Sequence, residues 1–147
     1  MVDIQTEIII NQPAHVVADY AMQPDHAPEW YVNIQSAEWR TEKPLRQGSQ
    51  IAFKAKFLGR EMAYVYEVKE LVPGQKLVMQ TADGPFPMET TYTFEAMDAY
   101  ITKMKLRNRG KPSGFSKLFS PFMERMMRRA NKKDLQKIKD IIETLDR

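Results

Sequence analysis

Residues 121–145, PFMERMMRRANKKDLQKIKDIIETL, decide the fold of this protein. Apolar side chains recur in this segment every three or four residues, the spacing of one face of an α-helix. They are Phe122, Met123, Met126, Met127, Leu135, Ile138, Ile141, Ile142 and Leu145. Ser120 and Pro121 suit the N-cap and the first helical position. The segment therefore predicts one helix of roughly 37 Å, at about 1.5 Å per residue, whose apolar stripe needs a surface to cover it.

The region between Ile34 and Arg109 predicts that surface, because its hydrophobic period is two. Apolar and polar residues alternate in runs such as Ile51–Phe57 and Met88–Glu95, and turn sequences such as Pro73-Gly74 separate the runs. Such alternation is typical of an antiparallel sheet with one buried and one wet face. We expect about six or seven strands, with the helix lying across the concave face.

One strand leaves its register open. Met62–Leu71 carries apolar residues on both faces, so either Tyr64 and Tyr66 or Ala63 and Val65 point inward. In the last strand the inner positions are better defined. They are Tyr100, Thr102, Met104 and Leu106.

The chain opens with a predicted strand, Ile4–Ile10, followed by two short helical segments, Ala14–Ala21 and Gln23–Trp30, which prolines bound. The fold class is therefore α+β: a curved antiparallel sheet wrapped around a long C-terminal helix, with two short helices after the first strand. The first and last strands should be neighbours or edges of one sheet.

Size and composition limit the function. A length of 147 residues predicts a single domain over residues 1–147, and 43% apolar with 28% charged residues is typical of a soluble globular protein. The absence of cysteine excludes disulfides, thiolate catalysis and thiolate metal sites. The chain has no basic signal-like start and no apolar run long enough to span a bilayer. We therefore expect a cytoplasmic protein without stable membrane insertion.

Several segments along the whole chain resemble the START-like, or SRPBCC, helix-grip superfamily, and most closely its polyketide cyclase/dehydrase-like branch. They are Glu7–Val17, Pro28–Val32, Gln47–Ser49, Tyr66–Gly74 and Asp134–Lys139. One departure is Val16-Val17, where relatives commonly carry a Val-Trp pair. The resemblance implies the helix-grip fold. It says little about chemistry, because relatives include lipid carriers, cyclases and chaperone activators.

No catalytic constellation is visible, and we expect no metal and no cofactor. His15 lies four residues before Asp19, a spacing that would allow two metal ligands, but no third ligand follows from the sequence. His26, beside Asp25, could act as a general base, although a surface helix accommodates it equally well. The catalytic residues, if there are any, stay open.

Aromatic and methionine side chains on the predicted inner faces are more informative. Methionine adapts to apolar guests, and buried tyrosine hydroxyls need hydrogen-bond partners that a ligand can supply. We therefore expect a cavity on the order of 300–1,000 Å³ between sheet and helix, the usual range for ligand pockets, with residues 23–31 as its lid or floor. The candidate ligand-binding residues are Phe53, Tyr64, Tyr66, Met88, Tyr92, Met104, Phe122, Met123 and Met126. The competing interpretation is plain core packing.

Basic residues of the last strand, Lys103, Lys105, Arg107 and Arg109, should be solvent-exposed on the outer face. No aromatics are interleaved with them there, so we expect no nucleic-acid partner. The leading hypothesis is binding or carriage of an apolar small molecule such as a lipid, polyketide or flavonoid-like compound. A cyclase/dehydrase-type enzyme and a protein-interaction module are the alternatives. The identity of the ligand and the oligomeric state stay open.

Overall fold

A computed structural model describes residues 2–57, 59–83, 87–110 and 121–145 of the chain, except for the side chains of residues 57, 121 and 123. Seven strands and three α-helices make up this part, with one short 3₁₀ turn. In chain order they are β1 (Val2–Ile10), α1 (Ala14–Ala21), η1 (Pro24–His26), α2 (Ala27–Trp30), β2 (Ile34–Trp39), β3 (Gln50–Phe57), β4 (Arg60–Val72), β5 (Lys76–Asp83), β6 (Met88–Asp98), β7 (Ile101–Gly110) and α3 (Pro121–Thr144).

All seven strands belong to one antiparallel sheet with the order β1-β7-β6-β5-β4-β3-β2. Consecutive strands from β2 to β7 are neighbours, and β1 pairs with β7 along its whole length. The expectation that the first and last strands are neighbours in one sheet is confirmed. Two register shifts interrupt the pairing of β4 with β5, near Val65 and near Glu70. Such bulges add twist, which helps the sheet to curl.

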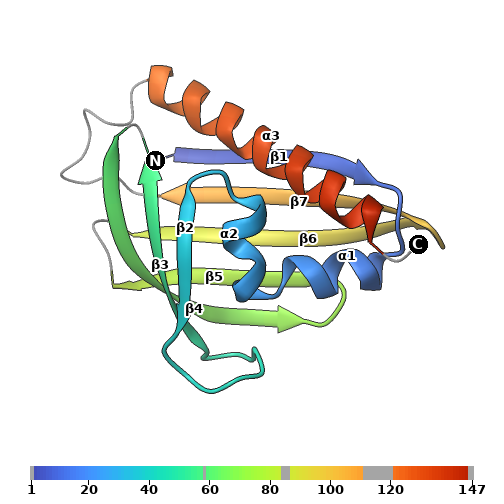
Figure 1. Cartoon of the computed structure of the whole chain (residues 1–147), viewed down its shortest axis with the longest axis horizontal. Coiled ribbons are helices and arrows are strands. Elements are labelled where there is room, and N and C mark those ends of the chain that lie inside the picture. Colours follow the sequence, from blue (N-terminus) through green and yellow to red (C-terminus); the bar gives the residue numbers. More distant parts are fainter. Residues whose placement is uncertain (1, 58, 84–86, 111–120, 146–147) are drawn as a thin grey trace.

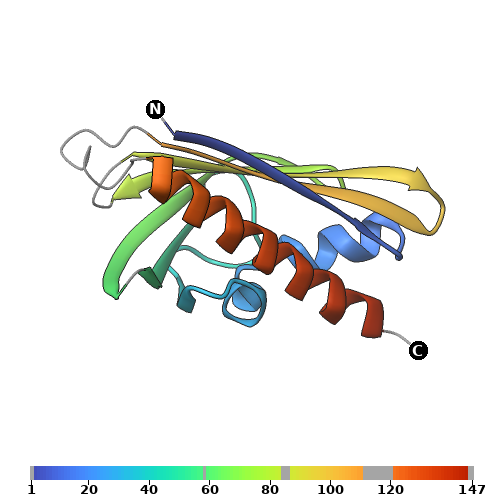
Figure 2. The same ribbon diagram turned by 90° about the horizontal axis from the view of Figure 1, so that it is seen from above.

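The long helix α3 crosses the concave side of this sheet, as its apolar stripe predicts (Figure 1). Figure 2 shows α1 and α2 on the same side of the strands as α3. The buried side chains of α3 include Leu135, Ile138 and Ile142, which join the core formed with the inner face of the sheet. The helix-grip fold is confirmed. Within the described residues, no helix is both long enough and apolar enough to cross a membrane.

The inner-face register of β4 is the one with Tyr64 and Tyr66 pointing inward. Both are buried, as is Val68, whereas Ala63 next to Tyr64 is exposed. The first register shift places its extra residue, Ala82, on β5, and the extra residue of β4, Lys69, comes after Val68, so the alternation of burial continues from Tyr64 to Val68. This settles the choice that the sequence left open.

Two side chains that were expected to face the core do not. Tyr100 is 74% exposed, because it precedes β7 in the tight turn after β6, so the inner alternation begins with Thr102. Phe122 is 62% exposed at the start of α3. Successive residues of a helix are rotated by about 100°, and the inward direction set by Leu135 and Ile138 continues toward the N-terminus through Met127, away from Phe122.

Candidate ligand-binding cavity

A cavity of about 290 Å³ lies between the inner face of the sheet and the stretch of α3 from Met127 to Asp134. This volume is at the lower edge of the range of roughly 300–1,000 Å³ typical of small-molecule pockets. Strands β3, β4, β5 and β6 contribute most of the apolar wall, and α3 closes it. The apolar and aromatic wall includes Ile34, Phe53, Ala55, Met62, Tyr64, Met79, Met88, Met127 and Ala130.

Five of the nine side chains expected from the sequence line this cavity: Phe53, Tyr64, Tyr66, Met88 and Tyr92. They come from strands β3, β4 and β6, which are brought together by the curl of the sheet. The alternation of inward and outward positions placed them there. Their role in binding a ligand stays a prediction.

Three of the expected residues are not part of the cavity wall, and this corrects the sequence interpretation. Met104 is fully buried, but it packs in the core. Phe122 is exposed and Met126 is half-buried on the flank of α3, whereas the next residue, Met127, lines the cavity. The helix is rotated by one position from the expected orientation, because its inner stripe includes polar residues. The side chain of the ninth residue, Met123, lies outside the described part of the structure.

Asn131 and Asp134 are the polar residues that the sequence analysis missed. Both are buried and both line the cavity from α3. They stand in helical register with Met127 and Ile138, so they continue the inner stripe between the two apolar clusters. Their helical spacing from Met127 and Ile138 could have identified them. A search for apolar residues alone does not detect an amide or a carboxylate at these positions.

A chain of hydrogen bonds runs along one wall. The hydroxyls of Tyr66 and Thr90 are 2.7 Å apart, and Thr90 donates to Asn108 Oδ1 at 2.7 Å. Since the single hydroxyl proton of Thr90 is used in this way, Tyr66 is the donor to Thr90. These side chains are satisfied within the wall, so they provide a fixed polar strip beside the aromatic surface.

A second polar contact joins the helical layer to the sheet. The hydroxyl of Tyr31, directly after α2, lies 2.6 Å from the hydroxyl of Tyr92 on β6. Trp30 stacks on Tyr31 with ring centroids 4.0 Å apart and meets the Tyr92 ring edge-on at 5.7 Å. The end of the proline-bounded segment therefore reaches the cavity wall, where its role as lid or floor stays a prediction.

Asp134 on α3 contacts the segment that follows α2, next to Tyr31. Its Oδ1 accepts a hydrogen bond of 2.8 Å from the backbone N–H of Val32. Burial raises the pKa of this carboxyl to about 6, against the lowering effects of the Val32 hydrogen bond and of Lys137. The carboxyl can therefore change its protonation state near neutral pH.

The tyrosine hydroxyls around the cavity stay protonated at neutral pH. Burial raises the pKa of Tyr66 to about 12, with a smaller opposing effect from Thr90. Burial also raises the pKa of Tyr31, Tyr64 and Tyr92 well above the ordinary value. Each phenol is thus available as a hydrogen-bond donor or acceptor, but not as a base.

The histidines lie away from this chemistry. His26 stacks on Tyr20 at 4.1 Å, and its Nδ1 lies 3.0 Å from the Tyr20 carbonyl oxygen, so its contacts are structural. His15 is exposed on α1. In the described ranges, no group of three or more His, Asp or Glu side chains could hold a metal ion.

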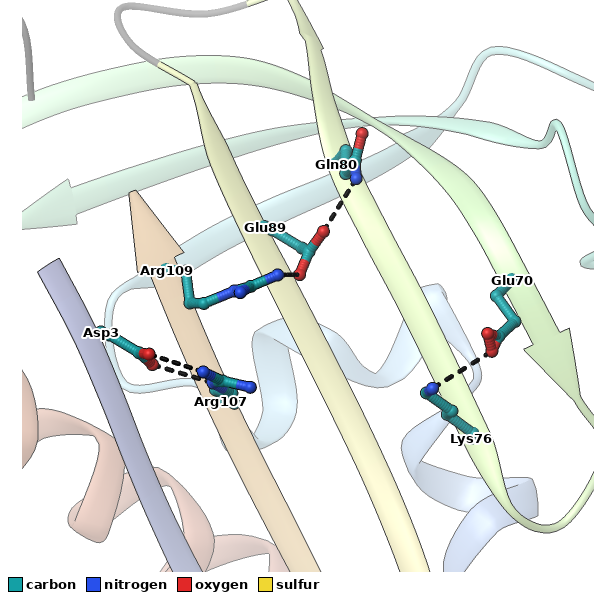
Figure 3. Close-up of polar contacts among 7 residues, drawn as sticks. All are labelled: Asp3, Glu70, Lys76, Gln80, Glu89, Arg107 and Arg109. Carbon is teal, nitrogen blue, oxygen red and sulfur yellow. Dashed lines mark hydrogen bonds and ion pairs between the residues drawn. The ribbon is translucent and has the colours of Figure 1, made fainter. Parts of the chain in front are cut away.

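The basic residues of β7 are less exposed than expected, because acids on neighbouring strands cover them. Arg107 donates two hydrogen bonds, of 2.8 and 2.6 Å, to Asp3, and Arg109 pairs with Glu89, which also accepts from Gln80 (Figure 3). Glu70 and Lys76 form a further pair on this face. Lys103 pairs with Glu7 at 3.5 Å. The outer face therefore presents mixed and largely neutralised charge.

We expect this outer face not to bind single-stranded DNA or RNA. Phosphates would compete with acids that already pair with Arg107 and Arg109, and any residual attraction should fall steeply with salt. Fluorescence anisotropy with a labelled oligonucleotide at about 0.05 and 0.15 M salt measures this. Tight binding that persists at the higher concentration would contradict the prediction.

Comparison with known proteins agrees with this architecture. Residues 1–143 match the family described as polyketide cyclase/dehydrase and lipid transport. No curated protein sequence matches the chain. Solved structures with the same fold include TTHA0849 from Thermus thermophilus, with 15% identity, a TM-score of 0.78 and coverage of 95% of this chain and 96% of that chain.

Two further structures give the same result. The Zhui aromatase/cyclase from Streptomyces sp. R1128 is 16% identical, with a TM-score of 0.76 over 96% of this chain and 93% of its own. A START superfamily protein from Mycobacterium smegmatis is 12% identical, with a TM-score of 0.72 over 97% and 95%. At these identities the similarity establishes the fold, and the family match establishes membership. The chain belongs to the polyketide cyclase/dehydrase and lipid transport family.

Proposed function

We propose that this protein binds or carries a hydrophobic small molecule in the cavity between the sheet and α3. The observation that carries the proposal is the wall itself: apolar and aromatic side chains surround the space, and a few buried polar groups line it. Small-molecule sites usually have this composition. A region of plain core would be closely packed, with little space for a ligand.

The aromatic side chains favour a flat ligand. Tyr64 lies 5.1 Å from Tyr66 and 5.6 Å from Phe53, measured between ring centroids, so three rings from β3 and β4 form one aromatic cluster in the wall. Methionines from three other positions, Met62, Met79 and Met88, complete it with flexible side chains. A polyketide, a flavonoid-like compound or a ring-containing lipid would fit such a surface.

Methyl NMR of the methionines tests the proposal. On titration with naphthalene, a flat apolar probe, we expect the methyl signals of Met62, Met79 and Met88 to shift, because aromatic rings displace nearby resonances. Met97 is exposed in β6 and serves as an internal control that should stay unchanged. If no cavity methionine responds to this or to larger flat probes, the wall is merely core, and a protein-interaction role becomes the better explanation.

A second candidate function, a cyclase/dehydrase-type enzyme, is favoured by one observation. Asp134 is an acid with a pKa of about 6 that lines an apolar cavity, and such a group can accept and return protons near neutral pH. Turnover of a linear polyketide substrate that is lost in Asp134→Asn and retained in Asp140→Asn, on the exposed face of α3, would support the enzyme. Binding without turnover would support the carrier.

A further inference from the structure

Three buried side chains around the cavity have hydrogen-bonding groups without a partner among the described residues. They are Asp134, Asn131 and Tyr64, which are 2%, 7% and 9% exposed. Asp134 uses Oδ1 for the Val32 N–H and leaves Oδ2 unused. Asn131 Nδ2 is fully buried and has no hydrogen-bond partner in the described ranges. Tyr64 lines the cavity, and its hydroxyl takes part in no hydrogen bond within the described structure.

These groups line one cavity. Asn131 and Asp134 are three residues apart on α3, so their side chains are neighbours on the same helix face. Tyr64 lies on β4, and burial raises the pKa of its hydroxyl, with smaller contributions from Tyr66, Tyr92 and Asp134. Buried polar groups without partners are costly, so a ligand that completes them binds more tightly.

The three groups offer one hydrogen-bond acceptor and two hydrogen-bond donors to a ligand. An ionised Asp134 Oδ2 accepts hydrogen bonds but cannot donate one, whereas Asn131 Nδ2 and the Tyr64 hydroxyl can donate. A ketone or an ether could accept from the donors but would leave Asp134 unpaired. A carboxylate would be repelled by Asp134. A protonated amine would satisfy Asp134 but could not accept a bond from Tyr64 or Asn131.

We infer that the cavity selects flat aromatic ligands that carry a hydroxyl group at their buried end. The hydroxyl donates to Asp134 Oδ2 and accepts from Asn131 Nδ2 or from the hydroxyl of Tyr64. This inference rests on the proposed binding function and specifies the ligand class as a phenol or an enol. The apolar remainder of the ligand lies against Phe53 and the methionines of the wall.

Matched probes test the inference. The affinities of 2-naphthol and 2-methylnaphthalene, which are similar in size and shape, are measured by calorimetry at about pH 7.5 with the full chain, above the pKa of Asp134. We expect 2-naphthol to bind ~10-fold more tightly, the effect of one hydrogen bond to a charged group. 2-Methoxynaphthalene, which accepts hydrogen bonds but cannot donate one to Asp134, should bind less tightly than 2-naphthol.

Substitutions test whether Asp134 and Tyr64 cause the preference for 2-naphthol. Asp134→Asn keeps an oxygen for the Val32 N–H but removes the free carboxylate oxygen, so the preference for naphthol should disappear. Asp140→Asn is the same change on the exposed face of α3 and should leave it intact. Tyr64→Phe removes a single oxygen and should reduce the preference a few-fold, which provides a test even if Asp134→Asn folds poorly.

The outcomes separate the two proposals. Equal affinity for naphthol and methylnaphthalene, or an undiminished preference in both cavity variants, would overturn the hydroxyl inference and leave the binding function standing. Failure of all three naphthalenes to bind would overturn the binding function, and the hydroxyl inference with it. A preference that is lost in Asp134→Asn and kept in Asp140→Asn supports both.

Discussion

Replacing Met88 by Trp should abolish ligand binding without unfolding the protein. Met88 begins β6, is half-buried and lines the cavity, so an indole at this position would occupy space that a ligand needs. We expect the affinity for 2-naphthol to fall by at least ~100-fold, equivalent to about 3 kcal/mol. Stability should change less than in a filled core, where added bulk costs about 1–3 kcal/mol, because the cavity has room for the ring.

The matched control for this change is Met97→Trp. Met97 lies in the same strand, but its side chain is half exposed near the turn that leads to β7. It should bind the probe as the parent protein does. Thermal melting of both variants verifies that they are folded. Full affinity in a folded Met88→Trp protein would place the ligand outside this cavity.

The second large effect concerns the pH dependence of stability. Asp134 has a pKa of about 6 in the folded protein, against an ordinary value of 3.8 that applies in the unfolded chain. The folded state therefore holds this proton more tightly, and the buried charge destabilises the fold progressively as the pH rises from about 4 to 6. At about 1.4 kcal/mol for each pH unit, the cost above pH 6 is ~3 kcal/mol.

Asp134→Asn removes this cost, because the amide does not ionise and still offers an oxygen to the Val32 N–H. Relative to the parent, the free energy of unfolding of the variant should rise by ~3 kcal/mol between about pH 4 and pH 7. Urea unfolding at a series of pH values measures the difference, with Asp140→Asn as the exposed control. A constant difference across the series would show that Asp134 does not titrate in this range.

The two effects have a common structural origin. The helix α3 contributes a polar patch, Asn131 and Asp134, to a largely apolar interior, where packing alone would favour apolar residues. Asp134 is stabilised in part by the backbone of Val32, which ties α3 to the connection after α2. Asp134 lines the cavity and lowers the stability of the fold above pH 6. Binding and catalytic sites commonly contain such destabilising groups.

Periodicity alone was sufficient for most of the fold. The alternation along β3, β6 and β7 identified their inner faces, and the stripe of α3 required a sheet to cover it. Local sequence also located the turns at Gly59 and Gly74, where the backbone takes φ values of 78° and 75° that glycine adopts without strain. These features depend on residues that are near one another in the chain, so they can be read from it.

The sequence by itself determined the curved sheet, the crossing helix and five residues of the cavity wall, because hydrophobic burial imposes a strict period on strands and helices. Only the tertiary structure decided the rotation of α3, which turns Met127, Asn131 and Asp134 inward and leaves Phe122 in solvent. It also decided the choice of Tyr64 over Ala63 in β4. The physical reason is that both depend on contacts between distant segments. A polar group becomes tolerable inside the protein when a distant partner, such as the Val32 N–H for Asp134, meets it there.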